Sequence, residues 1–204
     1  MRYARGHKEE ARARLLDAMG RGFRRQGYGV GVNDLAKEAG VTSGALYGHF
    51  RSKAEAFREA LALGLDGLRA GIEAYRATHG ARWGEAFAAF YLGAAHRRDI
   101  AGGCALPSLS AEVGRADEAA RGTYEAAMLR VAGTIADGLP SGSEEQRRRA
   151  AWEMLALLAG GTIIARGVLD EAVAEEIASA IRGAVGRVAA SEPLTYEAGV
   201  GEPV

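Results

Sequence analysis

Apolar residues recur at helical spacing along most of the chain, and no segment shows the sustained alternation expected of a β-strand. Leu15, Met19 and Phe23, for example, are four residues apart and fall on one helical face. Ser52 and Glu55 have the spacing of a capping box at the start of a long helix. We therefore expect an all-α fold with helices at residues 8–26, 33–39, 43–49, from 52 onward, 83–96, 105–114, 117–138, 143–167 and 170–190.

The second and third of these helices are short and are separated by a turn of about three residues that begins with Gly40. Glycine suits this position because the turn needs a left-handed backbone conformation. Leu35, Val41 and Leu46 are apolar where they would hold the two helices at a fixed angle, and the residues between them are small or polar. This pattern predicts a helix-turn-helix whose second helix enters the major groove of DNA.

The charge distribution agrees with a nucleic-acid partner, although the formal net charge of the chain is zero. Residues 1–53 contain 11 Lys and Arg against 5 Asp and Glu, so this segment carries +6 and the remainder carries −6. Such an asymmetry predicts a basic, DNA-binding head on an acidic body.

The helix-turn-helix residues resemble those of TetR/AcrR-type transcriptional repressors. The matching positions are Leu35-Ala36-x-x-Ala39-Gly40-Val41 and Gly44-x-Leu46-Tyr47-x-His49-Phe50-x-Ser52-Lys53. The resemblance covers roughly residues 8–60, and it departs from the common pattern at Gly31, where many members carry a Ser or Thr N-cap.

The resemblance implies a three-helix DNA-binding domain at residues 1–53 and a helical ligand-sensing and dimerisation domain at 54–190, followed by a flexible tail at 191–204. It also implies a repressor that a small-molecule effector releases from a palindromic operator on double-stranded DNA. The rival interpretation is a dimeric DNA-binding protein that responds to no ligand.

Most of the expected DNA contacts are to phosphate. Thr42 and Ser43 open the recognition helix, where free amides and hydroxyls can meet phosphate oxygens. Glycine and alanine dominate the rest of this helix, so part of the specificity is expected from thymine-methyl packing and DNA shape. Ala45 is expected to turn partly inward, and the alternative for Tyr47 and His49 is simple packing on the domain surface. The expected contact set is Thr42, Ser43, Gly44, Ala45, Tyr47, Gly48, His49 and Lys53.

The body contains no motif of comparable specificity, but it concentrates aromatic and flexible apolar residues. Ligand pockets are typically apolar with few polar groups, although such residues also build ordinary cores. The expected ligand-binding set is Trp83, Phe87, Phe90, Tyr91, Cys104, Tyr124, Met128, Trp152, Leu155 and Thr162. His96 stands beside Arg97 and Arg98, which favours a helix C-terminal cation over a ligand contact.

Cys104 is the only cysteine, so the chain can form no internal disulfide. It lies between two predicted helices, and modification of its thiol by oxidants or electrophiles is one way to release DNA. A following helix N-terminus and the nearby Arg97 and Arg98 would lower its pKa and favour the thiolate. The alternative is an inert, buried small residue.

The last two predicted helices carry an apolar stripe and small residues that suit a four-helix bundle formed by two copies of the chain. The alternative is an intramolecular core. The expected dimer interface is Gly160, Ile163, Ile164, Val173, Ile177, Ile181 and Val185.

Other functional classes find little support in the sequence. The longest apolar run, residues 155–165, is too short to cross a bilayer, and the basic N-terminus is not followed by an apolar signal core. The chain has no P-loop, dinucleotide fingerprint, metal-spaced Cys/His set or nucleophile elbow. We therefore expect a cytoplasmic protein that is not an enzyme, with no cofactor, metal or membrane partner.

Overall fold

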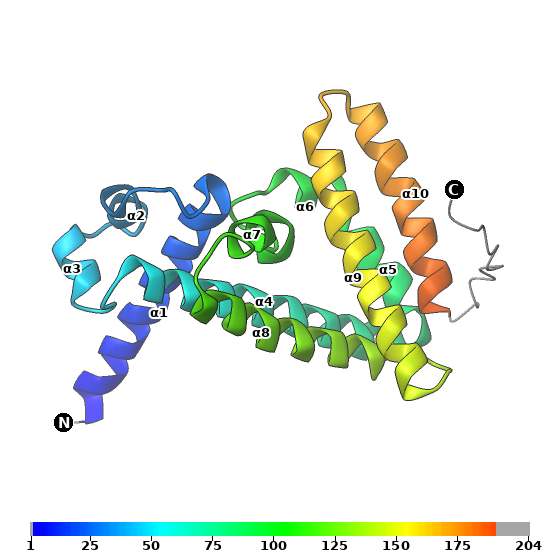
Figure 1. The fold of residues 1–204 in the computed structure, drawn as a ribbon, viewed down its shortest axis with the longest axis horizontal. Helices are drawn as coiled ribbons and strands as arrows, with labels where there is room; N and C mark the ends of the chain where they lie inside the picture. Colours follow the sequence, from blue (N-terminus) through cyan, green and yellow to red (C-terminus); the bar gives the residue numbers. More distant parts are fainter. Residues whose placement is uncertain (1, 191–204) are drawn as a thin grey trace, which may run out of the picture.

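The computed structural model describes residues 2–190, with side chains from residue 9 onward, and this part of the chain is built from helices alone. Figure 1 shows an elongated molecule, with three N-terminal helices at one end and the last two long helices at the other. The long helices α4 and α8 run side by side between these ends. The helices are α1 (Arg2–Gln26), α2 (Val32–Glu38), α3 (Ser43–Tyr47), α4 (Lys53–His79), η1 (Gly80–Arg82), α5 (Trp83–Tyr91), α6 (Ala94–Arg98), α7 (Ala105–Val113), α8 (Glu118–Ala136), α9 (Glu144–Gly167) and α10 (Glu171–Ala189).

The all-α prediction is confirmed, and most predicted helices occur within two residues of their expected bounds. Helix α1 begins six residues earlier than predicted. The helix predicted at 83–96 is wrong as a single element, because Gly93 is extended (φ −66°, ψ 149°) and serves as the N-cap of α6. The tail predicted at 191–204 lies outside the described residues. No helix within residues 2–190 has the length and apolar character needed to cross a bilayer.

Side-chain caps start several of these helices. The Ser52 hydroxyl accepts a hydrogen bond from the Glu55 amide at 3.1 Å, as predicted for α4. The reciprocal half of the predicted capping box is wrong, because the Glu55 carboxylate accepts from the Arg51 amide at 2.6 Å instead of the Ser52 amide. A complete capping box occurs at α9, between Ser143 and Gln146.

One apolar core runs through the head and the body, because α4 belongs to both. It packs against α1 of the head and against α5, α7 and α8 of the body. Phe57, Leu61 and Leu65 of α4 are buried almost completely. The first helix also touches α7, so a displacement of the body helices can reach the head through direct packing.

Arg97 ties α6 to α10 from inside the body. Its side chain is only 3% exposed, and its guanidinium donates hydrogen bonds to the carbonyl oxygen of Leu92 and to the carboxylates of Glu171 (2.9 Å) and Glu175 (3.1 Å). Arg97 directly follows the helix predicted at 83–96, but it lies within α6. The three acceptors hold its side chain below the surface.

Candidate nucleic-acid interface and internal cavity

The helix-turn-helix is held by its turn and by a small apolar core. Gly40 has a φ of +68°, the left-handed conformation that the sequence predicted for the first residue of the turn. The following Val41 amide donates to the Ala36 carbonyl at 2.9 Å and so closes the turn. Leu35 of α2 and Leu46 of α3 are 0% and 2% exposed, so their packing fixes the angle between the two helices.

The predicted DNA-contact residues gather on the outer surface of α3 and its two ends. Five of them are exposed, namely Thr42, Gly44, Ala45, Tyr47 and Gly48, while Ser43, His49 and Lys53 are half-buried. Tyr47 is 55% exposed, so its phenol is available to a partner. The expectation that Ala45 turns partly inward is wrong, because the adjacent Leu46 takes the inward position and leaves Ala45 on the open face.

Lys53 is oriented by an aromatic residue from the turn before α2. Its Nζ atom lies 4.6 Å from the centre of the Tyr28 ring, within the range of a cation–π interaction. Tyr28 is itself packed against Phe57, with the ring centroids 4.9 Å apart. The Lys53 ammonium is therefore placed at the start of α4 by the core of the head.

Only part of the positive charge of the head is free to meet phosphate. Arg12 forms an ion pair with Glu59, Arg21 pairs with Asp17, and Arg25 pairs with Glu38. The Arg12 and Arg25 pairs brace α1 against α4 and α2, whereas the Arg21–Asp17 pair lies within α1.

Two further basic side chains, Lys37 and Arg51, are exposed near α3, and the sequence analysis did not single them out. Arg51 could have been predicted, since it fills the variable position between Phe50 and Ser52 of the motif.

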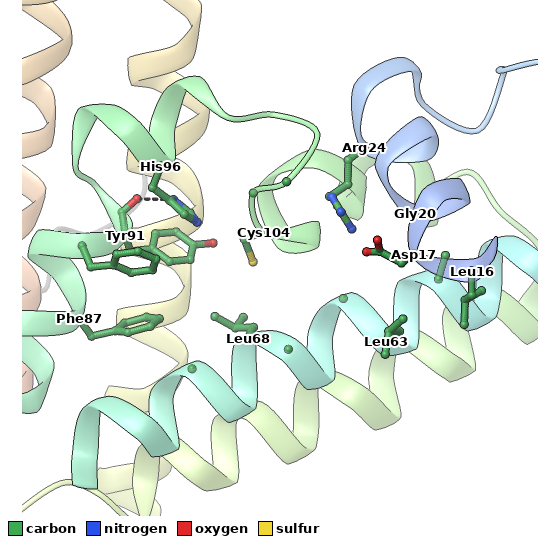
Figure 2. A pocket seen from close by; sticks show the side chains of 17 residues that line it. Leu16, Asp17, Gly20, Arg24, Leu63, Leu68, Phe87, Tyr91, His96 and Cys104 are labelled. Atoms are coloured by element: carbon green, nitrogen blue, oxygen red, sulfur yellow. Dashed lines mark hydrogen bonds between the residues drawn. The ribbon is translucent and has the colours of Figure 1, made fainter. Parts of the chain in front are cut away.

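A cavity of about 340 Å³ lies between the head and the body. Figure 2 shows α4 along one side of it, with residues of α1 at one end and residues of α5 and α6 at the other. The residues that line it are Leu16, Asp17, Gly20, Arg24, Ala60, Leu63, Gly64, Gly67, Leu68, Gly71, Phe87, Phe90, Tyr91, His96, Gly102, Gly103 and Cys104.

Three polar groups meet in the middle of this cavity. Burial raises the pKa of Tyr91 well above its ordinary value, and burial also raises the pKa of the Cys104 thiol. Burial lowers the pKa of His96, whose Nδ1 lies 2.7 Å from the Tyr91 carbonyl oxygen. His96 lies in the last turn of α6, as predicted, but its lowered pKa and its place in the cavity wall favour a neutral ring over a cation.

The raised pKa also contradicts the expectation of a thiolate at Cys104. Arg97, predicted to stabilise that thiolate, is instead paired with glutamates of α10. The cations that act on the thiol are Arg24 and Arg166, and their effect is smaller than that of burial. A protonated thiol is a poor nucleophile, so the arrangement does not favour a preformed thiolate, although Cys104 is only half-buried and lines the cavity.

The predicted ligand-binding residues divide between two places and the core. Four of them, Phe87, Phe90, Tyr91 and Cys104, line the cavity between head and body. Four others, Tyr124, Met128, Trp152 and Leu155, line a second, more apolar cavity of about 620 Å³ between α7, α8 and α9.

Trp83 and Thr162 line neither cavity. The Trp83 indole donates to the Gly138 carbonyl at 2.9 Å, and the Thr162 hydroxyl donates to the Leu158 carbonyl at 2.8 Å. Both residues are buried with their polar atoms satisfied, which is a structural role.

The contribution of α1 and α4 to the first cavity was not predicted from the sequence. Arg24 reaches it from α1, and three glycines of α4, Gly64, Gly67 and Gly71, leave space along it. The glycines were detectable, because their spacing of three and four puts them on one helical face. Arg24 was not, because its role depends on where α1 packs.

The predicted dimer residues of α9 and α10 do not all face the same way. Ile163, Ile164 and Val173 are 50%, 57% and 40% exposed. Gly160 and Ile177 are half-buried, and the open space beside Gly160 contains no other atom of the described chain within 4 Å of a built Cβ.

The other two predicted interface residues point into the body. Ile181 packs against Gly161, where a built Cβ would lie 2.9 Å from the isoleucine side chain. Val185 is 0% exposed and has no surface to offer a partner. In these two positions the intramolecular alternative holds, because α9 and α10 pack closely against each other.

Residues 15–60 match the family of bacterial regulatory proteins of the tetR type, a segment that contains the helix-turn-helix. No match to the chain was found among curated protein sequences.

Solved structures extend the likeness to the rest of the chain. A TetR-family transcriptional regulator from Streptomyces coelicolor is 27% identical, with a TM-score of 0.67 over 89% of this chain and 97% of that one. The reduced form of NemR from E. coli is 20% identical, with a TM-score of 0.72 over 86% and 95% of the two chains. A TetR-family regulator from Agrobacterium tumefaciens is 16% identical, with a TM-score of 0.70 over 86% and 97%. At such identities the last two show a shared fold alone.

Proposed function

We propose that the chain is a TetR-family transcriptional regulator that acts as a homodimeric repressor, released from a palindromic operator by a small-molecule effector. The match of residues 15–60 to the tetR family and the fold shared over most of the chain support this proposal. The effector occupies the cavity between α1, α4 and α5, and the two heads bind successive major grooves of double-stranded DNA.

The observation that carries this proposal is that the head and the body share the wall of the cavity. Leu16, Gly20 and Arg24 belong to α1, which is braced to α2 by the ion pair between Arg25 and Glu38. The contacts of a ligand bound between α1 and α5 therefore change when the head moves relative to the body. A ligand can shift a conformational equilibrium only through such differential contacts, and coupling of about 1–3 kcal/mol is typical.

Occupancy of the cavity, rather than modification of Cys104, is the release mechanism that we propose. The thiol lines the cavity, but its raised pKa leaves little thiolate at neutral pH. We expect Cys104→Ser to keep ligand-induced release, measured as the loss of DNA binding on titration with the ligand. Loss of release in this variant, with DNA binding and fold intact, would favour covalent modification instead.

The experiment that tests the whole proposal starts from DNA. Duplexes bound by the protein are selected from a random pool, and their affinity is measured by fluorescence anisotropy. We expect a palindromic consensus, and we expect Tyr47→Ala to weaken binding to all duplexes because the exposed phenol contacts phosphate. A non-palindromic consensus or an unchanged affinity in Tyr47→Ala would contradict the proposal.

The same assay separates the effector-controlled repressor from a ligand-independent DNA-binding protein. A panel of apolar anions, cations and neutral compounds is added to the protein–DNA complex, and thermal unfolding of the free protein is followed in parallel. An effector that prefers the free form raises its melting temperature and releases DNA. If no compound changes either quantity, the ligand-independent alternative stands.

A further inference from the structure

Two positive charges lie in or directly behind the wall of the cavity between head and body. Arg24 lines it from α1, and the Nη2 atom of Arg166 lies 3.2 Å from a Cβ built on Gly103, which forms part of the opposite wall. Within the described residues neither guanidinium forms an ion pair with a carboxylate. Arg24 donates to the Ala101 carbonyl at 2.6 Å, and Arg166 donates to the Arg97 carbonyl at 2.8 Å. Burial lowers the pKa of both arginines, which is the expected cost of a charge without an anion.

The one acidic side chain in the cavity wall does not cancel this charge. Asp17 forms its ion pair with Arg21, four residues further along α1. Asp99, on the nearby loop, accepts a hydrogen bond from the Gly102 amide at 2.7 Å. His96 adds no charge when neutral. Arg24 and Arg166 therefore remain as two cations around the cavity.

Two buried polar atoms lack a hydrogen-bond partner at this place. The Tyr91 hydroxyl belongs to a residue that is 1% exposed, and it has no hydrogen-bond partner of ordinary geometry within the described chain. The group nearest to it in chemistry is the Cys104 thiol, a poor acceptor, and the two groups influence each other's pKa. Figure 2 shows this hydroxyl directed at Cys104 across the cavity. The Nη2 atom of Arg166 is also buried and unsatisfied within the described chain. Buried donors without an acceptor are costly, so their presence indicates a group that is bound there in use.

The remaining wall is apolar and has the shape of a slot. Gly64, Gly67 and Gly71 present no side chains along α4, and a Cβ built on Gly67 would meet nothing within 4 Å. The ring of Phe87 lies at the end of the cavity away from α1 (Figure 2), and Phe90, whose ring centroid is 6.3 Å from that of Phe87, also lines the cavity. From Ala60 to Gly71 the slot follows α4 for roughly 16 Å, at about 1.5 Å per residue.

We propose that this cavity binds an organic carboxylate with a flat apolar body. The carboxylate accepts hydrogen bonds from Arg24 and Tyr91, while the apolar body lies along the glycines of α4 towards Phe87 and Phe90. The inference deepens the proposed function and rests on it in one respect, because it takes this cavity to be the effector site.

Arg24 would then link the ligand to the head. The Nε atom of Arg24 donates a hydrogen bond to the carbonyl oxygen of Ala101, on the loop between α6 and α7. A carboxylate competes with this carbonyl, because hydrogen bonds between two charged groups are stronger than those to a neutral acceptor. Binding therefore exchanges a contact between α1 and the body for a contact between α1 and the ligand.

Three acids test the charge preference directly. Binding of benzoate, 2-naphthoate and biphenyl-4-carboxylate to the full chain is measured by calorimetry without DNA, each beside its neutral carboxamide. We expect at least one acid to bind about tenfold or more tightly than its amide. If no acid binds more tightly than its amide, the inference is overturned.

Substitutions locate the bound carboxylate. We expect Arg24→Gln to weaken binding of the preferred acid about tenfold or more while the affinity for its amide stays unchanged, and Arg24→Lys to restore part of the loss. Arg25→Gln is the matched control, since it removes the same charge one residue away on the exposed side of α1. Equal losses in Arg24→Gln and Arg25→Gln would overturn the assignment of Arg24.

Gly67→Leu tests whether the ligand binds in the cavity itself. The new side chain enters open space next to α4, so we expect a folded protein that binds neither the acid nor the amide. Retained acid binding in this variant would overturn the proposed location.

If amides or cations release DNA and acids do not, the charge inference fails while the effector-controlled repressor stands. If the acids bind but no ligand releases DNA, the inference about binding holds and the proposed function fails.

Discussion

Tyr47 and Lys53 reach the outer surface of the head in different ways. Tyr47 extends from the short helix α3 and is free of the core, whereas the Lys53 ammonium is held over the Tyr28 ring. Such an oriented cation loses little side-chain entropy when it meets a phosphate. The resemblance of the motif positions predicted both residues. For Tyr47 there is also a physical reason, because the inward Leu46 leaves its neighbour on the outward side of α3.

Lys53→Gln is expected to weaken DNA binding by a similar factor for every sequence. Each phosphate contact releases condensed counterions, so loss of one contact reduces the slope of log affinity against log salt by about 1. Anisotropy titrations over a range of salt concentrations measure this slope. Arg148→Gln, on an exposed part of α9 far along the chain, is the control, and an identical slope in both variants would refute the contact.

His96 should make the protein less stable in mild acid. Burial lowers its pKa below 6.5, so as the pH falls below that value the unfolded chain takes up a proton before the folded protein does. The stability is therefore complete above about pH 6.5 and declines below it. Urea unfolding between pH 7.5 and 5.5 measures the slope (the range brackets the ordinary pKa of histidine), and we expect His96→Asn to flatten it. The exposed His79→Asn should retain the full slope; if it flattens the curve equally, His96 is not the responsible group.

Contacts between helices hold the body together. The buried Arg97 joins α6 to α10, and Arg166 joins α9 to the carbonyl of Arg97. Helical periodicity predicted most of these helices, since a buried stripe is visible in the sequence. It missed the break at Gly93 and the burial of Arg97, because both depend on neighbours from distant parts of the chain. Arg24 was missed in the cavity for the same reason. Phe87 and Tyr91 were predicted as ligand-binding residues because aromatic side chains are typical of apolar pockets.

Arg97→Met should loosen the end of the body. The substitution leaves the Leu92 carbonyl without its partner and separates α6 from Glu171 and Glu175. These glutamates are half-exposed and recover hydration, so we expect a loss of about 1–3 kcal/mol in the free energy of unfolding. Urea denaturation measures it. Arg98→Met removes an exposed partner of the same Glu171 and should cost less than about 0.5 kcal/mol.

The molecule as a whole presents an apolar face on its last two helices. Ile163, Ile164 and Val173 are exposed on it, and Leu169 in the connecting turn is fully open. Apolar groups of this kind mark association surfaces, and two-fold pairing buries the same patch on both copies. A dimer formed here would place the two heads at the outer ends of the assembly, since α1–α3 lie at the opposite end of the chain fold (Figure 1).

Ile163→Glu combined with Ile164→Glu tests this face. Charged side chains in the centre of an apolar interface oppose association, and we expect the dimer dissociation constant to rise roughly 30-fold or more. Sedimentation velocity over a concentration series measures it. Ile100→Glu, at an exposed isoleucine of the loop before α7, should leave the oligomeric state unchanged. A doubly substituted protein that remains a dimer would place the interface elsewhere.

Small residues on the exposed surface of α3 leave the DNA preference of the proposed repressor open to redesign. Ala45 is exposed, and a side chain added at Gly44 would meet only the Thr42 hydroxyl, at an ordinary 3.9 Å. Long polar residues can therefore be introduced at both sites without disturbing Leu46 or the turn. A library of variants at these two positions would have new operator preferences. Each variant would keep the effector response of the unaltered body.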